Sequence, residues 1–109
     1  MPKTIRKFWP DAFSEVTAVN FNWDEINTDS VVLVTASEYV PQPNAPRGTP
    51  LKRFVGDATI RIDDIAPHGP PFDNNRGVTF VIVVDFPNPV FVVTDITLLD
   101  ATVVDTQEG

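Results

Sequence analysis

The feature that most constrains the fold of this chain is the branching of its aliphatic side chains. The 109 residues include 16 valines, seven isoleucines and 11 threonines, but only four leucines. Two heavy atoms on Cβ stiffen a side chain and suit a pleated strand better than a helix. The sequence therefore predicts an all-β protein and argues against a helical bundle. A chain of this length ordinarily forms one domain around one core.

Composition excludes several classes of site and partner. The chain is cysteine-free, so it has no disulfide, no thiolate nucleophile and no cysteine-ligated metal. Its formal net charge of −7 argues against a nucleic-acid partner, because neutralising phosphates requires clustered lysine and arginine. All eight basic residues lie in residues 1–76, so a basic N-terminal arm and the acidic C-terminal region could attract each other.

The chain shows no pattern typical of targeting or membrane insertion. No run approaches the roughly 20 apolar residues that a membrane-spanning helix needs. The basic start, residues 1–7, is followed by no apolar segment of signal-peptide length. We therefore expect no membrane span. Two locations stay open, namely the cytoplasm and, for a secreted mature form that lacks its signal peptide, the outside of the cell.

Alternating apolar residues and turn signals divide the chain into short strands. The expected strands cover residues 17–23, 30–40, 51–65 (broken near Gly56), 78–86 and 90–99, with residues 101–104 extending the last or forming their own. Loops rich in proline separate them at residues 41–50 and 67–77. The pattern predicts an antiparallel β-sandwich, jelly-roll-like, or a small β-barrel.

The expected domain covers residues 14–105. Residues 1–13 would precede it as an N-terminal arm with weak helical potential, and residues 106–109 would follow it as a C-terminal tail. The sequence shows no internal repeat and no linker that would divide it into two domains.

The last two long strands are expected to form a hairpin closed by Pro87-Asn88-Pro89. The register of this hairpin pairs Val84 with Val92, Ile82 with Thr94, Phe80 with Ile96, and Val78 with Leu98. These side chains share one face, which is apolar apart from Thr94 and would be the core face.

The other face of the expected hairpin is also apolar at its centre. It would form a patch rimmed by acids and hydroxyls, comprising Val81, Val83, Phe91 and Val93. Such a patch usually meets another surface, which here could be a second subunit, the chain's own arm or loops, or a ligand. Phe8 and Trp9 of the arm would be further contacts.

His68 and the carboxylates are the candidates for catalysis. An imidazole can act as a general base near neutral pH. A serine hydrolase site would require Ser14, Ser30 or Ser37 to approach His68, and none of them lies in a Gly-x-Ser-x-Gly turn. Paired carboxylates could serve a glycosidase, but 15 acidic residues in so short a chain produce close pairs by chance.

The sequence predicts no cofactor and leaves calcium as the one open alternative. Asp24, Asn27 and Asp29 place three oxygen donors on one turn, and residues 73–75 offer a second cluster. The first lacks the glycine and glutamate of an EF-hand. Capping of the turn by its own side chains explains the same residues without a metal.

Four residues could bind a ligand, either a carbohydrate stacked on aromatic rings or a small apolar molecule: Trp9, Tyr39, Phe72 and His68. Trp23 shares the parity of Val19 and Phe21, which indicates a core position instead.

The function favoured by the sequence is that of a non-enzymatic interaction protein that associates with itself, as a homo-oligomer or assembly subunit. A ligand-binding module is the alternative, with the two proline-rich loops as its mouth. A small-barrel isomerase or cyclase is a third reading, since such enzymes need no sequence motif.

Overall fold

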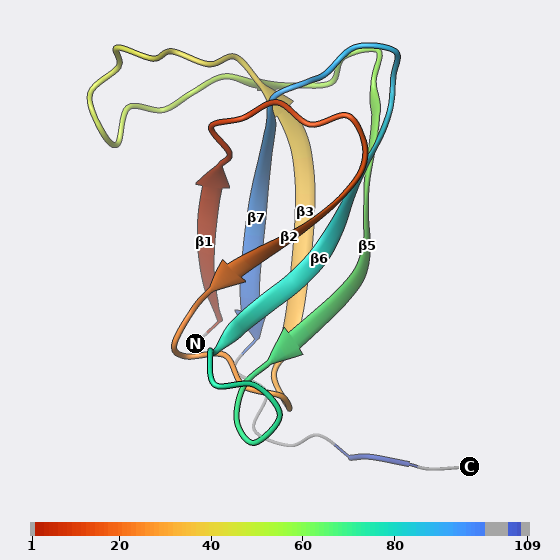
Figure 1. Cartoon of the computed structure of the whole chain (residues 1–109). Helices are drawn as coiled ribbons and strands as arrows, with labels where there is room; N and C mark the ends of the chain where they lie inside the picture. The colour runs from red at the N-terminus through yellow and green to blue at the C-terminus, as the bar shows by residue number, and fades with distance from the viewer. Residues whose placement is uncertain (1, 100–104, 108–109) are drawn as a thin grey trace.

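The computed structural model describes residues 2–99 and 105–107 of the chain. These residues form β1 (Lys3–Phe8), β2 (Glu15–Asn22), β3 (Val31–Tyr39), β4 (Arg53–Phe54), β5 (Thr59–His68), β6 (Gly77–Asp85) and β7 (Val92–Leu99). The described part of the chain contains no helix, and so none that could cross a membrane (Figure 1). The strand expected at residues 101–104 lies outside the described residues.

The seven strands form two antiparallel sheets that face each other. One sheet has the order β1-β7-β3-β4 and the other the order β2-β6-β5. The connections from β1 to β2, from β2 to β3 and from β6 to β7 all pass from one sheet to the other (Figure 1). The predicted all-β antiparallel sandwich is therefore confirmed. β1 and β2 lie along one side of it, and β3 and β5 lie along the other.

The predicted C-terminal hairpin is wrong. β6 pairs with β2 and β5, whereas β7 pairs with β1 and β3. The segment around Pro87-Asn88-Pro89 is an arch that carries the chain across the core, and Val90 forms an isolated bridge with Phe13. Val84 and Val92 thus point into the core from opposite sheets instead of pairing within one.

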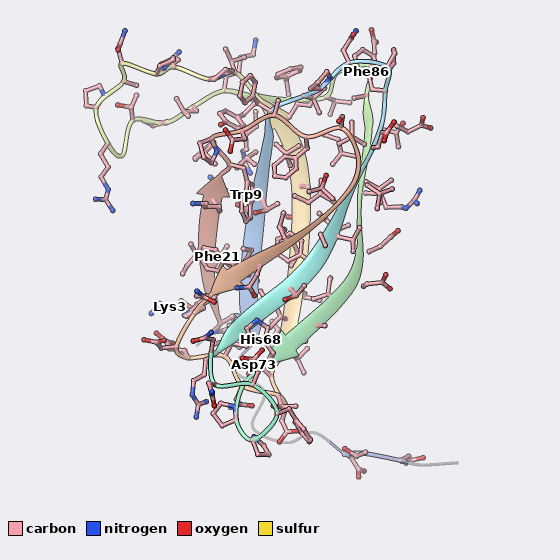
Figure 2. All side chains as sticks on the ribbon, viewed as in Figure 1. Lys3, Trp9, Phe21, His68, Asp73 and Phe86 are labelled. Carbon is pink, nitrogen blue, oxygen red and sulfur yellow. The ribbon has the colours of Figure 1, made fainter. Side chains whose placement is uncertain are left out.

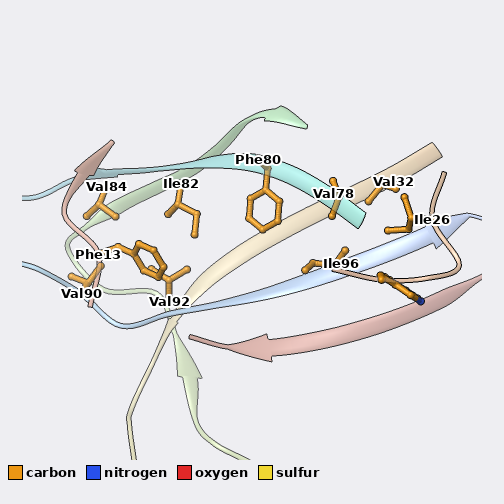
Figure 3. Packing of buried hydrophobic residues seen from close by; sticks show 11 residues of the cluster. Phe13, Ile26, Val32, Val78, Phe80, Ile82, Val84, Val90, Val92 and Ile96 are labelled. Atoms are coloured by element: carbon orange, nitrogen blue, oxygen red, sulfur yellow. The ribbon is translucent and has the colours of Figure 1, made fainter. Parts of the chain in front are cut away.

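The core lies between β6 and β7, the central strands of the two sheets. Side chains with no exposed surface point inward from both, namely Val78, Phe80, Ile82, Val92 and Ile96 (Figure 3). Thr94, which alternates with Val92 and Ile96 in β7, is equally buried. The parity predicted for the core face is correct, because the same alternate residues point inward from an arch as from a hairpin. Trp23, at 7% exposed, joins this core, as expected from its parity with Val19 and Phe21.

Residues 3–8, expected as part of an arm, form strand β1 and complete a sheet. β1 pairs along its whole length with β7, from Lys3 opposite Leu98 to Phe8 opposite Val93. Ile5 alternates toward the core, and this single apolar residue was too weak a signal for a strand. The expected loop at residues 67–77 is shorter than predicted, because β5 continues through Pro67 to His68. Pro67 is tolerated there because β5 is an edge strand.

Candidate functional site

The apolar patch expected at Val81, Val83, Phe91 and Val93 does not form as one surface. β6 turns Val81 and Val83 to the outer face of one sheet, while Phe91 and Val93 lie on the outer side of the other. Val93 is only 2% exposed, because β1 and β3 flank it with Phe8 and Ser37. The structure therefore divides the predicted interface residues between opposite faces of the sandwich.

Trp9, which the sequence predicted as a contact residue, is packed against the core of the domain. Its indole Nε1 donates a hydrogen bond to Thr94 Oγ1 at 2.9 Å, and its ring packs edge-on against Phe13 and Phe80. Thr94, the one polar residue on the expected core face, is thereby explained as the buried acceptor for this indole. Beside Trp9 a groove of about 540 Å³ is lined mainly by residues 9–14, which connect β1 to β2, and by Thr17 and Val19 of β2.

Tyr39 lies next to Trp9, but Phe72 does not. The Tyr39 hydroxyl donates a hydrogen bond to the Trp9 carbonyl oxygen at 2.6 Å, and burial raises the pKa of this hydroxyl. The Tyr39 ring packs edge-on against Phe8 and Phe91. Phe72, at 85% exposed, lies in the loop between β5 and β6, at the other end of the sandwich. The aromatic candidates therefore form no single stacking platform.

His68 is held by asparagines at the end of β5. Its Nδ1 donates a hydrogen bond to the Asn75 carbonyl oxygen at 2.8 Å, and its Nε2 lies 2.6 Å from Asn20 Oδ1. The Asp73 carboxylate lies 3.7 Å from Nδ1. His68 and Asp73 lie together at the end of the sandwich opposite Phe86 (Figure 2). Because both ring nitrogens contact asparagine oxygens, this histidine attaches the loop after β5 to β2 and is not aligned with a serine.

The predicted calcium ligands belong to a capped turn. Asn27 Oδ1 accepts a hydrogen bond from the Asp29 amide, and Ser30 Oγ accepts one from the Asn27 amide, both at 2.9 Å. Asp73 caps the Asn75 amide in the same way in the second cluster. Within the described residues no three His, Cys, Asp or Glu side chains converge as a metal site would require. Calcium binding at Asp24, Asn27 and Asp29 stays a prediction.

An ionic cluster covers the outer face of the larger sheet. Arg6 donates two hydrogen bonds to the Asp95 carboxylate, at 2.7 and 2.9 Å, and Arg53 approaches the same carboxylate at 3.3 Å. The hydrogen bond from Arg6 and the two positive charges hold the pKa of Asp95 below its ordinary value. These charges are therefore paired within the chain, on a face that also carries the ring of Phe91 and the 52% exposed Leu33.

The sheet edges differ in how they are protected against further pairing. β1 carries Lys3, Arg6 and Lys7, and β4 is only two residues long. β5 carries adjacent aspartates, with a bulge between Asp63 and Ala66, followed by Pro67. Charges, bulges, prolines and short length are the devices that keep edge strands from associating.

The β2 edge, residues 16–22, has none of these devices. Its sequence Val-Thr-Ala-Val-Asn-Phe-Asn contains no charge, no proline and no glycine. Among the described residues β2 pairs only with β6, so its other side presents unpaired backbone groups. The absence of charge over seven residues was visible in the sequence, but its meaning depends on β2 lying at an edge.

Glu38 is a second feature, after the β2 edge, that the sequence did not predict. It is 9% exposed, and its Oε2 is buried without a hydrogen-bond partner in the described part of the chain. The sequence did contain one signal of this burial, because Glu38 lies on the same side of β3 as Val32 and Val34, which face the core.

Comparison of the whole chain with known protein families, with curated proteins and with solved structures finds no match.

Proposed function

We propose that the protein is a non-enzymatic β-sandwich that associates with itself, and that two copies join antiparallel along their β2 edges. The observation that carries this proposal is the lack of protection over residues 16–22 of β2, beside three other edges that are charged, bulged or short. An unpaired strand of this kind is a template for another strand.

The surface beside the β2 edge supports the same partner. The outer strip, defined as Val16, Ala18, Val81 and Val83, is apolar, and its members face one another across β2 and β6. Val16 is 69% exposed. The side of the outer strip farther from the β2 edge is bounded by the ion pair of Arg61 and Asp63 on β5, at 3.0 Å. Pairing at β2 would bring the outer strips of two copies side by side and bury part of this surface.

A second copy suits this edge because the strand can pair with itself without conflict. With the two-fold axis at Val19, Thr17 lies opposite Phe21 and Ala18 opposite Asn20. The period of two keeps the inward residues of both strands on one face and the outer strips on the other. Glu15 then lies opposite Trp23, so the two Glu15 carboxylates are at opposite ends of the paired strands and do not repel each other closely.

The expected affinity is modest. Each cross-strand pair contributes about 0.2–1 kcal/mol, and each backbone hydrogen bond about 0.5–1.5 kcal/mol. Ordering and association costs remove much of the total, so we expect about 4–8 kcal/mol, which corresponds to dissociation constants between about 1 mM and 1 μM. The association should therefore depend on concentration.

The test is an edge charge with a matched control. Ala18→Lys places a lysine on the exposed side of β2, and Ala66→Lys makes the same change at an exposed position of the protected β5 edge. Sedimentation velocity from about 1 μM to 1 mM covers the expected range. The wild type and Ala66→Lys should increase in mass with concentration, and Ala18→Lys should stay at the monomer mass.

Two results would contradict the proposal in different ways. A wild type that stays monomeric over the whole range would exclude self-association. A concentration-dependent mass that is the same in Ala18→Lys and the wild type would keep self-association but exclude the β2 edge. Both lysines are at exposed sites, so their melting temperatures should match the wild type within the usual scatter of surface substitutions.

A further inference from the structure

We propose that the buried Glu38 carboxylate forms a binding pocket for an alkylammonium group, such as a small primary amine or a lysine side chain. The pocket lies where the chain leaves β4 and crosses to β5 in the other sheet. It has a volume of about 140 Å³, and Glu38 is one of the residues that line it. This site is separate from the β2 edge, so the inference does not rest on the proposed function.

The carboxylate of Glu38 is unusual in what surrounds it. β3 pairs Glu38 with Phe54 on one side and with Val92 on the other. Gly56 lies directly against Oε2, where a Cβ atom would overlap the oxygen. Within the described residues nothing donates a hydrogen bond to Oε2. Removing a carboxylate from water without a donor is costly, so an oxygen in this position indicates a missing partner.

The lining of the pocket favours an organic cation. Besides Glu38, its walls are mainly apolar and come from Ala36, Phe54, Gly56, Ala58 and Ile60. Ser37 also lines the pocket, and in the register of β3 and β7 it lies opposite Val93. An alkylammonium needs one charge-assisted hydrogen bond and apolar contact for its carbon atoms, and an aromatic ring such as Phe54 adds cation–π attraction.

The same lining disfavours a metal ion. Calcium takes six to eight oxygen ligands, and magnesium needs six in near-ideal geometry. Among the described residues that line the pocket, Glu38 supplies the one carboxylate. The volume also limits the ligand, because a water molecule takes about 30 Å³ of liquid, so the pocket accepts a group of about four or five heavy atoms.

The access route is at the turn before β5. Val55 lines the pocket and is 99% exposed, and Phe54 is 37% exposed. The pocket therefore opens to solvent at this turn. A side chain in place of Gly56 would displace the Glu38 carboxylate from its position.

The test is an NMR titration of the full chain with n-propylammonium chloride, with n-propanol as the neutral compound of the same size. Saturable shifts of the Gly56 and Ala58 amides are expected with the amine and not with the alcohol. Glu38→Gln keeps the side-chain shape and should weaken binding at least tenfold. Glu25→Gln changes an exposed carboxylate, paired with Lys3, and should leave the binding unchanged.

Each of the other outcomes would overturn the proposal. These are absence of saturable shifts in the wild type, equal binding of propanol, and equal binding by Glu38→Gln. A parallel titration with calcium chloride covers the metal alternative: calcium shifts at Gly56 without propylammonium shifts would assign the pocket to a metal ion. Gly56→Ala provides a second variant, and it should abolish the shifts at Ala58 if the variant folds.

Discussion

The hydrogen bond between Trp9 and Thr94 gives the most direct test of how this fold is held together. Thr94 has no exposed surface, and its Oγ1 accepts the indole hydrogen of Trp9 at 2.9 Å. Thr94→Val keeps the shape of the side chain and replaces the acceptor with a methyl group. The partly buried indole N–H would then lose its partner.

The expected loss of stability follows from two opposing effects. Leaving a buried donor unsatisfied costs about 1–3 kcal/mol. The extra buried methyl group returns about 0.8 kcal/mol. The net destabilisation should be about 1 kcal/mol, which in a domain of this size lowers the melting temperature by about 4 °C.

A double-mutant cycle with Trp9→Phe separates the hydrogen bond from packing. Phenylalanine keeps an aromatic ring but has no N–H, so in the Trp9→Phe background Thr94→Val should leave no donor unsatisfied and should gain about 0.8 kcal/mol from the added methyl group. Urea unfolding of the four proteins should then give a coupling energy of about 2 kcal/mol if the bond stabilises the fold as argued. Equal destabilisation by Thr94→Val in both backgrounds, or none in the wild type, would refute the reasoning.

Two further predictions concern acid stability and the N-terminal strand. Because Arg6 holds the pKa of Asp95 down, the ion pair stabilises the fold above the unfolded-state value of about 3.9 and is lost as pH falls through the lower folded value. In urea unfolding from about pH 6 to pH 2, Asp95→Asn should lose less stability than the wild type, and an equal loss in both would contradict this. Deleting residues 1–9 removes β1 and Trp9 and should abolish folding instead of only weakening assembly; a cooperative melt at the wild-type temperature would show otherwise.

Side-chain parity could be read from the sequence, but the pairing of strands could not. Phe80 and Ile82 point inward whether β6 forms a hairpin with β7 or faces it across the core. The alternation of apolar residues specifies a face and carries no information about which strand is the neighbour. The arch at Pro87-Asn88-Pro89 was therefore indistinguishable from a tight turn.

The density of valine in β6 and β7 has a different cause from the one first considered. Apolar residues on both faces suggested a hairpin with a partner on each side. Instead each strand is the centre of its own sheet, where flanking strands shelter the outer face as well. Val93 shows this effect, since its neighbours on β1 and β3 leave it 2% exposed.

The candidate sites could be predicted from the sequence even less than the fold, because they depend on neighbours that are distant in sequence. The uncharged run of β2 became informative only when β6 was found on one side of it and nothing described on the other. Glu38 is significant because Gly56 and Phe54 close around it from another part of the chain. Neither relation follows from composition or local pattern.

The central position of the last two strands has a consequence for synthesis of the chain. β1, β2, β3 and β5 all pair with β6 or β7, and the Arg6–Asp95 contact spans 89 residues. A nascent chain that has reached Arg76 thus has β1 to β5 but neither of the two central strands. Such distant contacts make folding slow, and the ribosome must release the C-terminal strands before either sheet can close. Until then the uncharged β2 segment is exposed, so the period of greatest aggregation risk should fall during translation.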